Sequence, residues 1–266
     1  MKKLTILIAV LFIGAGLFAQ THQTATIIQN GNNNVAYSTQ TQSPYAGPTV
    51  TLYGTQSGNG NALYATQTGQ DNYSYITQSG LSNTVDLDQT ALDGGAINHS
   101  ELTQSGNSNY ANVNQEDPRN LSASAPYVYN TAYATQSGNG NTYMLDQGNG
   151  WGADNYSNLK QSGNNNISWL DQHGHIEYSI IKQIGDGNFA DLDQPSGGGT
   201  GAQLDSYLYQ TGNTNYASVS QVNGNNDSWS WQDGNSNYAD VYQWGYNSDS
   251  WSEQEGNSNT LNLIQE

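Results

Sequence analysis

Glutamine recurs every eleven residues along most of this chain, and this spacing limits the accessible folds more than any other feature. The longest uninterrupted run begins at Gln210 and ends at Gln265. If insertions between runs are allowed, twenty units end at a glutamine, the first at Gln29. A fixed internal period predicts a solenoid, in which each unit buries its apolar face only by stacking on its neighbours.

The bulk composition alone favours the opposite conclusion. Only 34% of the residues are apolar and 10% are charged, which is typical of low-complexity, disordered chains. The regular spacing argues against disorder, and we predict one repetitive domain over residues 20–266. The chain has no cysteine, so disulfides cannot stabilise it.

The first nineteen residues have the form of a secretory signal peptide. Lys2 and Lys3 precede an apolar stretch that ends in Gly-Leu-Phe-Ala, which predicts cleavage after Ala19. The alternative, an uncleaved membrane anchor, is disfavoured because the stretch is shorter than the roughly 20 residues that a span requires. Cleavage would make the chain more acidic than its formal charge of -17, which argues against nucleic acid as a partner.

Each eleven-residue unit reads as a strand with one buried face. In the unit from Asn109 to Gln115, Ala111 and Val113 take the second and fourth positions after the asparagine, and polar or aromatic residues alternate with them. Two units form one turn, so the sequence predicts about ten turns of two parallel, in-register sheets. The fold class is therefore all-β, a β-solenoid that gives a cross-β fibre on polymerisation.

The segment Gln-x-Gly-x-x-Asn between strands predicts a tight arc. Glycine tolerates positive φ and asparagine accepts the left-handed conformation. The framing glutamine and asparagine are in phase with the inward face, where their amides can stack on those of the next turn. The predicted arc and ladder residues are Gln29, Gly31, Asn34, Gln56, Gly58, Asn61, Gln78, Gly80, Asn83, Gln104, Gly106, Asn109, Gln136, Gly138, Asn141, Gln161, Gly163, Asn166, Gln183, Gly185, Asn188, Gln210, Gly212, Asn215, Gln232, Gly234, Asn237, Gln254, Gly256 and Asn259.

Odd and even units differ, so the true repeat is twenty-two residues. Odd units place serine inside, as at Ser74 and Ser100, whereas even units place alanine or larger apolar residues there. Arcs after odd units all keep the motif without insertion, but of the nine arcs after even units only the one that starts at Gln67 keeps it strictly, and the others are substituted or extended. The extensions follow Gln40, Gln89, Gln115, Gln147 and Gln194, and the substitutions include Glu177, Asn223 and Ser248. We therefore predict one regular edge and one variable edge.

The repeat resembles that of the curlin family, and the match from Gln104 through Asn109 and Ala111 to Gln115 is residue for residue. The resemblance covers essentially all of residues 20–266. It implies a secreted subunit of curli-type amyloid fibres that is exported across the outer membrane through a pore and polymerises in biofilm matrix with a nucleator subunit. The chain departs from the familiar pattern in having about ten turns rather than about five, and in its long insertions.

The sequence gives only weak evidence for ligand-binding sites. His173 and His175 form the closest histidine pair, but no third ligand is spaced to complete a metal site, and we expect a solvent-exposed arc there. A column of Asp88, Asn114, Asp146, Asp171 and Asp193 is predicted on one outer face. Either it discourages sideways association by repulsion, which we favour, or it binds divalent cations.

Aromatic residues are predicted to form a stripe on the outer face of the odd strands: Tyr53, Tyr75, Tyr133, Tyr207, Trp229 and Trp251. Stacked aromatics are ordinary cross-strand stabilisers, although such a stripe could also grip polysaccharide. A threonine row, Thr55 to Thr135, is too short and mixed to favour ice binding. No spacing supports a nucleophile with its base, so the chain is not expected to be an enzyme and no cofactor is predicted.

The leading hypothesis is an extracellular structural subunit, located on the cell surface in a fimbria-like fibre, that polymerises end to end for surface adhesion and cell aggregation. The first unit, with Ala25 and Ile27, and the last, with Leu261 and Leu263, keep the pattern without a capping helix, which implies open ends. The alternative is a monomeric repeat adhesin or carbohydrate-binding solenoid that uses the aromatic stripe on a polysaccharide or host surface.

Overall fold

The computed structural model describes residues 22–42, 49–91, 96–117, 128–148, 154–174, 176–195 and 203–266. The predicted signal peptide, His175 and nearly all of the five insertions after even units lie outside these residues. Within the described ranges the structure contains no helix of the length and hydrophobicity that crossing a membrane requires.

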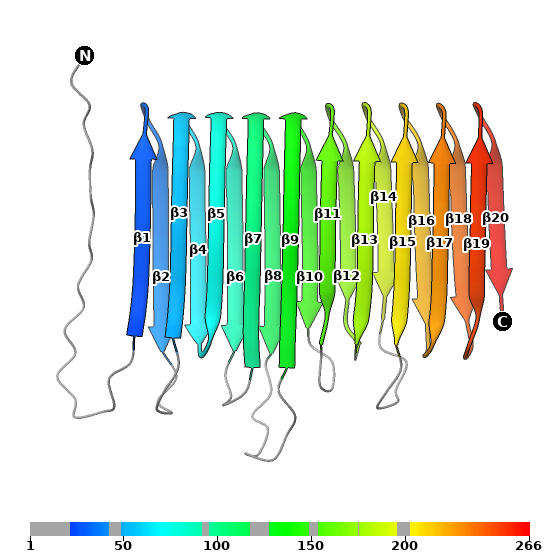
Figure 1. Ribbon diagram of the computed structural model, residues 1–266, viewed down its shortest axis with the longest axis horizontal. Helices are drawn as coiled ribbons and strands as arrows, with labels where there is room; N and C mark the ends of the chain where they lie inside the picture. The colour runs from blue at the N-terminus through cyan, green and yellow to red at the C-terminus, as the bar shows by residue number, and fades with distance from the viewer. Residues whose placement is uncertain are drawn as a thin grey trace.

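In the part of the chain that the structure describes, twenty strands form two ten-stranded sheets, as the twenty repeat units predict (Figure 1). The odd-numbered sheet contains β1 (His22–Asn30), β3 (Thr49–Asn59), β5 (Asn72–Leu81), β7 (Ala96–Asn107), β9 (Val128–Asn139), β11 (Tyr156–Ser162), β13 (Glu177–Ile184), β15 (Leu204–Thr211), β17 (Asn226–Asp233) and β19 (Asp249–Glu255). The even-numbered sheet contains β2 (Val35–Gln42), β4 (Ala62–Gly69), β6 (Thr84–Ala91), β8 (Tyr110–Asp117), β10 (Thr142–Gly148), β12 (Ile167–Gln172), β14 (Phe189–Gln194), β16 (Tyr216–Val222), β18 (Tyr238–Trp244) and β20 (Thr260–Gln265).

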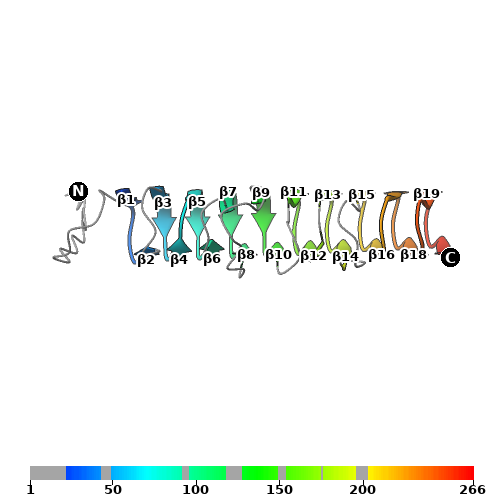
Figure 2. The same cartoon turned by 90° about the horizontal axis from the view of Figure 1, so that it is seen from below.

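The chain alternates between the two sheets, and each strand pairs in parallel with the strand two positions on. Figure 2 shows the odd-numbered and even-numbered strands as two layers. Equivalent positions face each other in every pair, so that Gln56 aligns with Gln29 and with Gln78. The offset between equivalent glutamines is 22 residues where no insertion intervenes and reaches 32 where the longest one does. The predicted β-solenoid of two in-register parallel sheets is confirmed.

The core lies between the sheets and consists of the alternate residues of every strand. Leu63, Val85 and Ala111 of the even-numbered sheet are buried, and so are Ser74 and Ser100 of the odd-numbered sheet. The predicted division into serine-bearing and apolar strands is therefore confirmed. One hydrophobic cluster runs through the layer from Leu52 in β3 to Val241 in β18.

The arcs after odd-numbered strands follow one another along one edge, as predicted (Figure 1). Their glycines have positive φ, from 95° at Gly256 to 127° at Gly31. The prediction that the framing asparagine takes the left-handed conformation is wrong. The residue before it does so, for example Ser108 (φ 56°), which leaves Asn109 free to begin the next strand and to use its amide in a ladder.

Candidate assembly site: the ladders and the two open ends

Two glutamine ladders run the length of the molecule. In the odd-numbered sheet the Nε2 atom of each glutamine donates to Oε1 of the glutamine in the next turn, from Gln29 to Gln254, at 2.7–3.0 Å. The even-numbered sheet repeats this from Gln40 to Gln265 at 2.8–3.0 Å. Every bond points the same way, with the donor on the N-terminal side.

The same amides also connect the two sheets. The Nε2 atom of Gln78 in β5 donates to the backbone oxygen of Ala62 in β4 at 2.9 Å, and that of Gln104 donates to Thr84 at 3.0 Å. Each internal glutamine thus uses both amide hydrogens and its oxygen. A buried amide that is fully bonded in this way avoids the desolvation cost of an unpaired polar group.

The framing asparagines of the regular edge form a third ladder, from Asn34 to Asn259. The backbone N–H of each donates to Oδ1 of the asparagine in the preceding turn, at 3.0 Å in all nine steps. From Asn34 to Asn237, each Nδ2 donates to the arc glycine carbonyl of the next turn, at 2.7–3.1 Å. The structure therefore joins the predicted glutamine, glycine and asparagine positions in one bonded edge.

A fourth ladder was missed by the sequence reasoning. The residue after each arc glycine accepts a bond from the backbone N–H of the equivalent residue in the turn before, as Asn139 does from Asn107 (3.1 Å) and Asp186 from Asn164 (2.7 Å). This position is Asn or Asp in nine of the ten arcs, and Leu81 is the exception. The recurrence of Gly-Asn was visible in the sequence and could have revealed the ladder.

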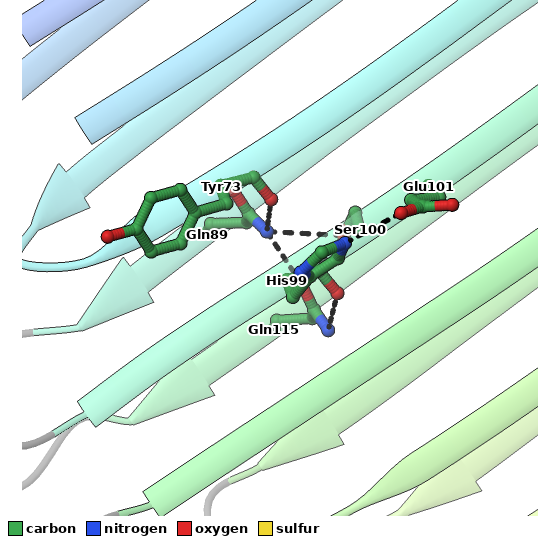
Figure 3. A network of polar contacts seen from close by, with 6 residues as sticks. All are labelled: Tyr73, Gln89, His99, Ser100, Glu101 and Gln115. Carbon is green, nitrogen blue, oxygen red and sulfur yellow. Dashed lines mark hydrogen bonds and ion pairs between the residues drawn. The ribbon is translucent and has the colours of Figure 1, made fainter. Parts of the chain in front are cut away.

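Two of the inward serines in the odd-numbered strands bond to the glutamine ladder of the even-numbered sheet. Figure 3 shows Ser100 between two turns of the even-numbered glutamine ladder: its Oγ accepts from Gln89 (3.2 Å) and donates to Gln115 (2.7 Å). The Nε2 of Gln89 also donates to the backbone oxygen of Tyr73 (3.3 Å). Ser74 makes the equivalent contacts one turn earlier. At these two positions the serine hydroxyl connects the two sheets across the core, whereas the hydroxyls of Ser179 and Ser206 have no hydrogen-bond partner among the described residues.

The variable edge carries a shorter asparagine ladder that Glu177 interrupts. Nδ2 of Asn98 donates to Asn72 (3.0 Å) and that of Asn130 donates to Asn98 (3.1 Å). Glu177 takes the equivalent place in β13, is 1% exposed, and neither of its carboxylate oxygens has a hydrogen-bond partner among the described residues. Burial raises the pKa of Glu177 to about 8, so this carboxyl is protonated at neutral pH.

The predicted acidic column is present on the outer face of the even-numbered sheet, and a histidine lies across it. Asp146, Asp171 and Asp193 align in consecutive strands. His173 lies 3.1 Å (Nδ1) from Asp171 and 3.5 Å (Nε2) from Asp146, and its side chain is only 31% exposed. The expectation of a solvent-exposed residue is therefore wrong for His173, because two carboxylates hold its ring against the strands.

The hydrogen bond that the His173 ring donates to the Asp146 carboxylate is the main cause that raises the pKa of His173. When the ring is protonated, its positive charge offsets part of the repulsion along the column. The described residues contain no group of three or more acidic or histidine side chains arranged to hold a metal ion.

The aromatic stripe is longer than predicted and is not confined to one column. Tyr75 and Tyr133 do not touch, because Glu101 lies between them in the register. The ring of His99 fills the gap, with centroids 6.0 Å from Tyr75 and 5.8 Å from Tyr133. Tyr156 and Tyr178 fill the next gap, so that nine rings from Tyr53 to Trp251 form a continuous row.

The rings in much of this row stack face to face, as Tyr53 and Tyr75 do at an interplanar angle of 14° and Trp229 and Trp251 at 15°. Stacking covers the ring faces that a sugar would use and leaves the ring edges exposed. The stacked pairs favour a role in stabilising the sheet over a role in binding carbohydrate.

Both ends of the stack formed by the described residues are open. Among the described residues, Gln254 and Gln265 donate one amide hydrogen to backbone oxygens, and no further turn receives the other. At the other end of the described range, which begins at His22, no turn precedes Gln29 and Gln40 to donate to their Oε1 atoms. Ile27 at one end and Leu263 at the other are only partly buried.

The fold and its side chains define a class: a β-solenoid with buried glutamine and asparagine ladders. Comparison with protein-family models, curated protein sequences and solved structures finds no match to this chain.

Proposed function

We propose that this chain is a secreted structural subunit that assembles end to end into curli-like amyloid fibres at the cell surface. The observation that carries the proposal is the complementarity of the two open ends. The C-terminal end offers glutamine N–H donors, and the N-terminal end offers glutamine oxygen acceptors at equivalent positions. The curlin-like repeat supports the same function from the sequence.

A second copy would continue both sheets without a change of register. β19 would pair with β1 of the next copy, with Gln254 opposite Gln29, and β20 would pair with β2, with Gln265 opposite Gln40. The asparagine ladder would continue from Asn259 to the next copy. Unpaired strand edges are the usual templates for adding another chain, and these edges also leave partly buried apolar residues to cover.

Charge favours this orientation over the reverse one. Residues 22–42 contain no acidic side chain, whereas the last turn carries Asp249, Glu253, Glu255 and the terminal Glu266. A C-terminal end that met another C-terminal end would bring like charges together, which is unfavourable. Contact between an acidic end and an uncharged end avoids this repulsion.

The test uses Gly256, whose position distinguishes folding from assembly. A Cβ atom on each earlier arc glycine of this edge would collide with the glycine carbonyl oxygen of the next turn, but at Gly256 only the side chain of Asn259 lies near. Gly256→Ala should therefore leave the single molecule folded, because only the local cost of a positive φ is added. In a fibre the new methyl group would meet the Gly31 carbonyl of the next copy and block growth.

Assembly would be followed by dye binding and electron microscopy, and the fold of the soluble chain by circular dichroism. Gly60→Ala is the control, because it adds the same kind of backbone strain at a position where a Cβ has room. Blocked elongation in Gly256→Ala alone supports end-to-end stacking. Wild-type elongation of Gly256→Ala, or fibres without a meridional spacing of about 4.8 Å, contradicts it.

The remaining parts of the proposal rest on the sequence. The signal-peptide pattern supports secretion, and the resemblance to curlins supports a nucleator subunit and an outer-membrane export pore as partners and biofilm matrix as the setting. No enzymatic activity is proposed. A seeding assay distinguishes a major subunit, which we favour, from a nucleator that starts assembly of another subunit at substoichiometric amounts.

A further inference from the structure

The outer face of the last three odd-numbered strands, β15, β17 and β19, carries a double row of aromatic side chains. One row consists of Tyr207, Trp229 and Trp251, and the other of Tyr209 and Trp231, followed by Glu253. Trp231 is 50% exposed and Trp251 is 65% exposed. An exposed apolar patch of contiguous aromatic residues is typical of an interaction surface.

Acidic columns flank this double row on both sides. Asp205, Asp227 and Asp249 align on one side. Asp233 and Glu255 align on the other side, next to Glu253 at the end of the second aromatic row. The four columns occupy alternate positions of the same three strands and all point away from the core. The order across the face is therefore acidic, aromatic, aromatic, acidic.

The three strands themselves contribute no positive charge to balance these carboxylates, and Lys182 of the neighbouring strand β13 aligns with Tyr209 rather than with either acidic column. The sequence from Gln203 to Glu266 contains no lysine, arginine or histidine. Burial, together with the neighbouring Asp205 and Asp249, raises the pKa of Asp227 above its ordinary value. A cation bound at this column would relieve the repulsion between stacked carboxylates.

We propose that this face, the outer surface of β15, β17 and β19, binds an extended basic polypeptide segment of a partner protein. Alternate side chains of an extended segment repeat about every 7 Å, which is the separation of neighbouring columns on this face. A segment with arginine at positions 1 and 7 and apolar residues at positions 3 and 5 matches the four columns. The arginines pair with the flanking carboxylates, and the apolar residues cover the ring edges between them.

The partner is distinct from a further copy of this chain in the fibre. The face lies parallel to the stacking axis, so it stays accessible whether the molecule is single or assembled. It also recurs once in every copy of a fibre, which would give a multivalent partner a regular row of sites.

The experiment titrates the chain, residues 20–266, with two fluorescently labelled heptapeptides of identical composition. The matched peptide has arginine at positions 1 and 7, leucine at 3 and 5, and serine elsewhere. The permuted peptide exchanges the arginines and the leucines. We expect the matched peptide to bind at least tenfold more tightly by fluorescence anisotropy. Equal affinity for the two peptides, or no binding of either, overturns the proposal.

Two double variants locate the site. Asp249→Asn with Glu255→Gln removes one carboxylate from each flanking column and should weaken binding of the matched peptide at least fivefold. Asp191→Asn with Asp193→Asn removes the same charge from the outer face of the even-numbered sheet and should change binding less than twofold. Equal weakening by both variants would mean attraction by net charge alone and would contradict the proposed face. The comparison of the two peptides on the unchanged chain does not depend on the folding of any variant.

Discussion

At the residue scale, the closest contacts between turns depend on glycine. The arc glycines of the regular edge lie so near the carbonyl of the next turn that a Cβ atom would overlap its oxygen, except at the last turn. The sequence predicts glycine here from its freedom in φ. The structure adds a second reason, which is the absence of space between stacked backbones.

Gly185 and Gly187, in the same arc, allow the effect of the positive φ to be distinguished from the effect of the limited space for a Cβ atom. Gly185→Ala should prevent normal stacking, because its Cβ would overlap the Gly212 oxygen. Gly187 also has positive φ (67°), but the nearest atom to its Cβ is the Thr214 methyl group at 3.5 Å. Gly187→Ala should therefore cost only about 1 to 2 kcal/mol, the local cost of a left-handed residue. The midpoint of denaturant unfolding, followed by circular dichroism, compares the two, and equal shifts would show that φ alone matters.

Glu177 predicts a pH dependence with a definite sign. Its pKa in the unfolded chain is close to the ordinary value of 4.5, and burial raises it to about 8 in the fold. The folded state is thus not penalised below about pH 4.5, and its stability falls as pH rises towards 8 and is lowest above it. Glu177→Gln should remove this loss and stabilise the chain at pH 9 by a few kcal/mol, with little effect at pH 4.

Denaturant unfolding at pH 4 and pH 9 measures this difference. Glu255→Gln is the control, because Glu255 is exposed at the surface and its replacement should have little effect on the change in stability between the two values. A Glu177→Gln variant that keeps the full pH dependence of the unmodified chain would contradict the assignment.

At the scale of the strand and arc, the two edges have different tolerances. On the variable edge, β16 ends at Val222 and β17 begins at Asn226, so a very short connection is compatible with the same register. On the regular edge, the glutamines and asparagines that frame each internal arc are buried and bonded to both neighbouring turns.

Removal of residues 196–200 would shorten the step from Gln194 to Leu204 to that from Gln221 to Asn226, which aligns in the same register. It should therefore leave assembly unchanged, since loop length has a small effect on free energy, about 0.6 kcal/mol per doubling. Gln183→Ala with Asn188→Ala should slow assembly strongly, because it leaves partners in the adjacent turns unpaired at roughly 1 to 3 kcal/mol for each group. Dye binding compares the rates. Equal damage in both variants would mean that the variable edge also carries essential ladders.

The sequence was sufficient to predict the strands and the arcs, but it was not sufficient to predict some of the contacts between side chains of different turns. Period and alternation predicted the strands, the inward Gln and Asn side chains and the regular edge, because each depends on local spacing. The part of the aromatic row that contains His99, Tyr156 and Tyr178 was not predicted. Those residues belong to a neighbouring register column, and their rings contact the rings of the row across the surface of the sheet. The contact of His173 with two carboxylates was missed for a similar reason, since one of them, Asp146, comes from the preceding turn.

At the scale of the whole molecule, the structure is a sum of equivalent turns, and its length should be adjustable in whole units. β17 and β19 pair with an offset of 22 residues. Deletion of residues 226–247 removes one such unit and joins positions that occupy the same place in the repeat. We expect this variant to fold and to assemble.

Deletion of residues 226–246, one residue fewer, should prevent the last turn from docking. A shift of one residue turns every inward side chain of the following strands outward. Circular dichroism and electron microscopy would compare the two deletions. Similar behaviour of both would show that register is not enforced by the ladders.

The pH of the medium should also affect the stability of the whole molecule and the rate of its assembly. Burial is the main cause that raises the pKa of Asp88, Asp191 and Asp193 above the ordinary value. Raised carboxyl pKa values in the fold mean that stability is complete below about pH 4 and decreases as pH rises through the folded values. Fibre formation followed by dye binding should be faster at pH 5 than at pH 8, and added salt should reduce the difference if repulsion causes it.

The common direction of the hydrogen bonds in the glutamine ladders has a further consequence for the electrostatics of the molecule. Eighteen side-chain amides point the same way, so their dipoles add along the axis as peptide dipoles add in a helix. Aligned amides polarise one another, so each bond strengthens those beside it. The hydrogen bonds at either end of a long array are therefore stronger than those of a short one, and attachment of each new turn becomes more favourable as the array lengthens.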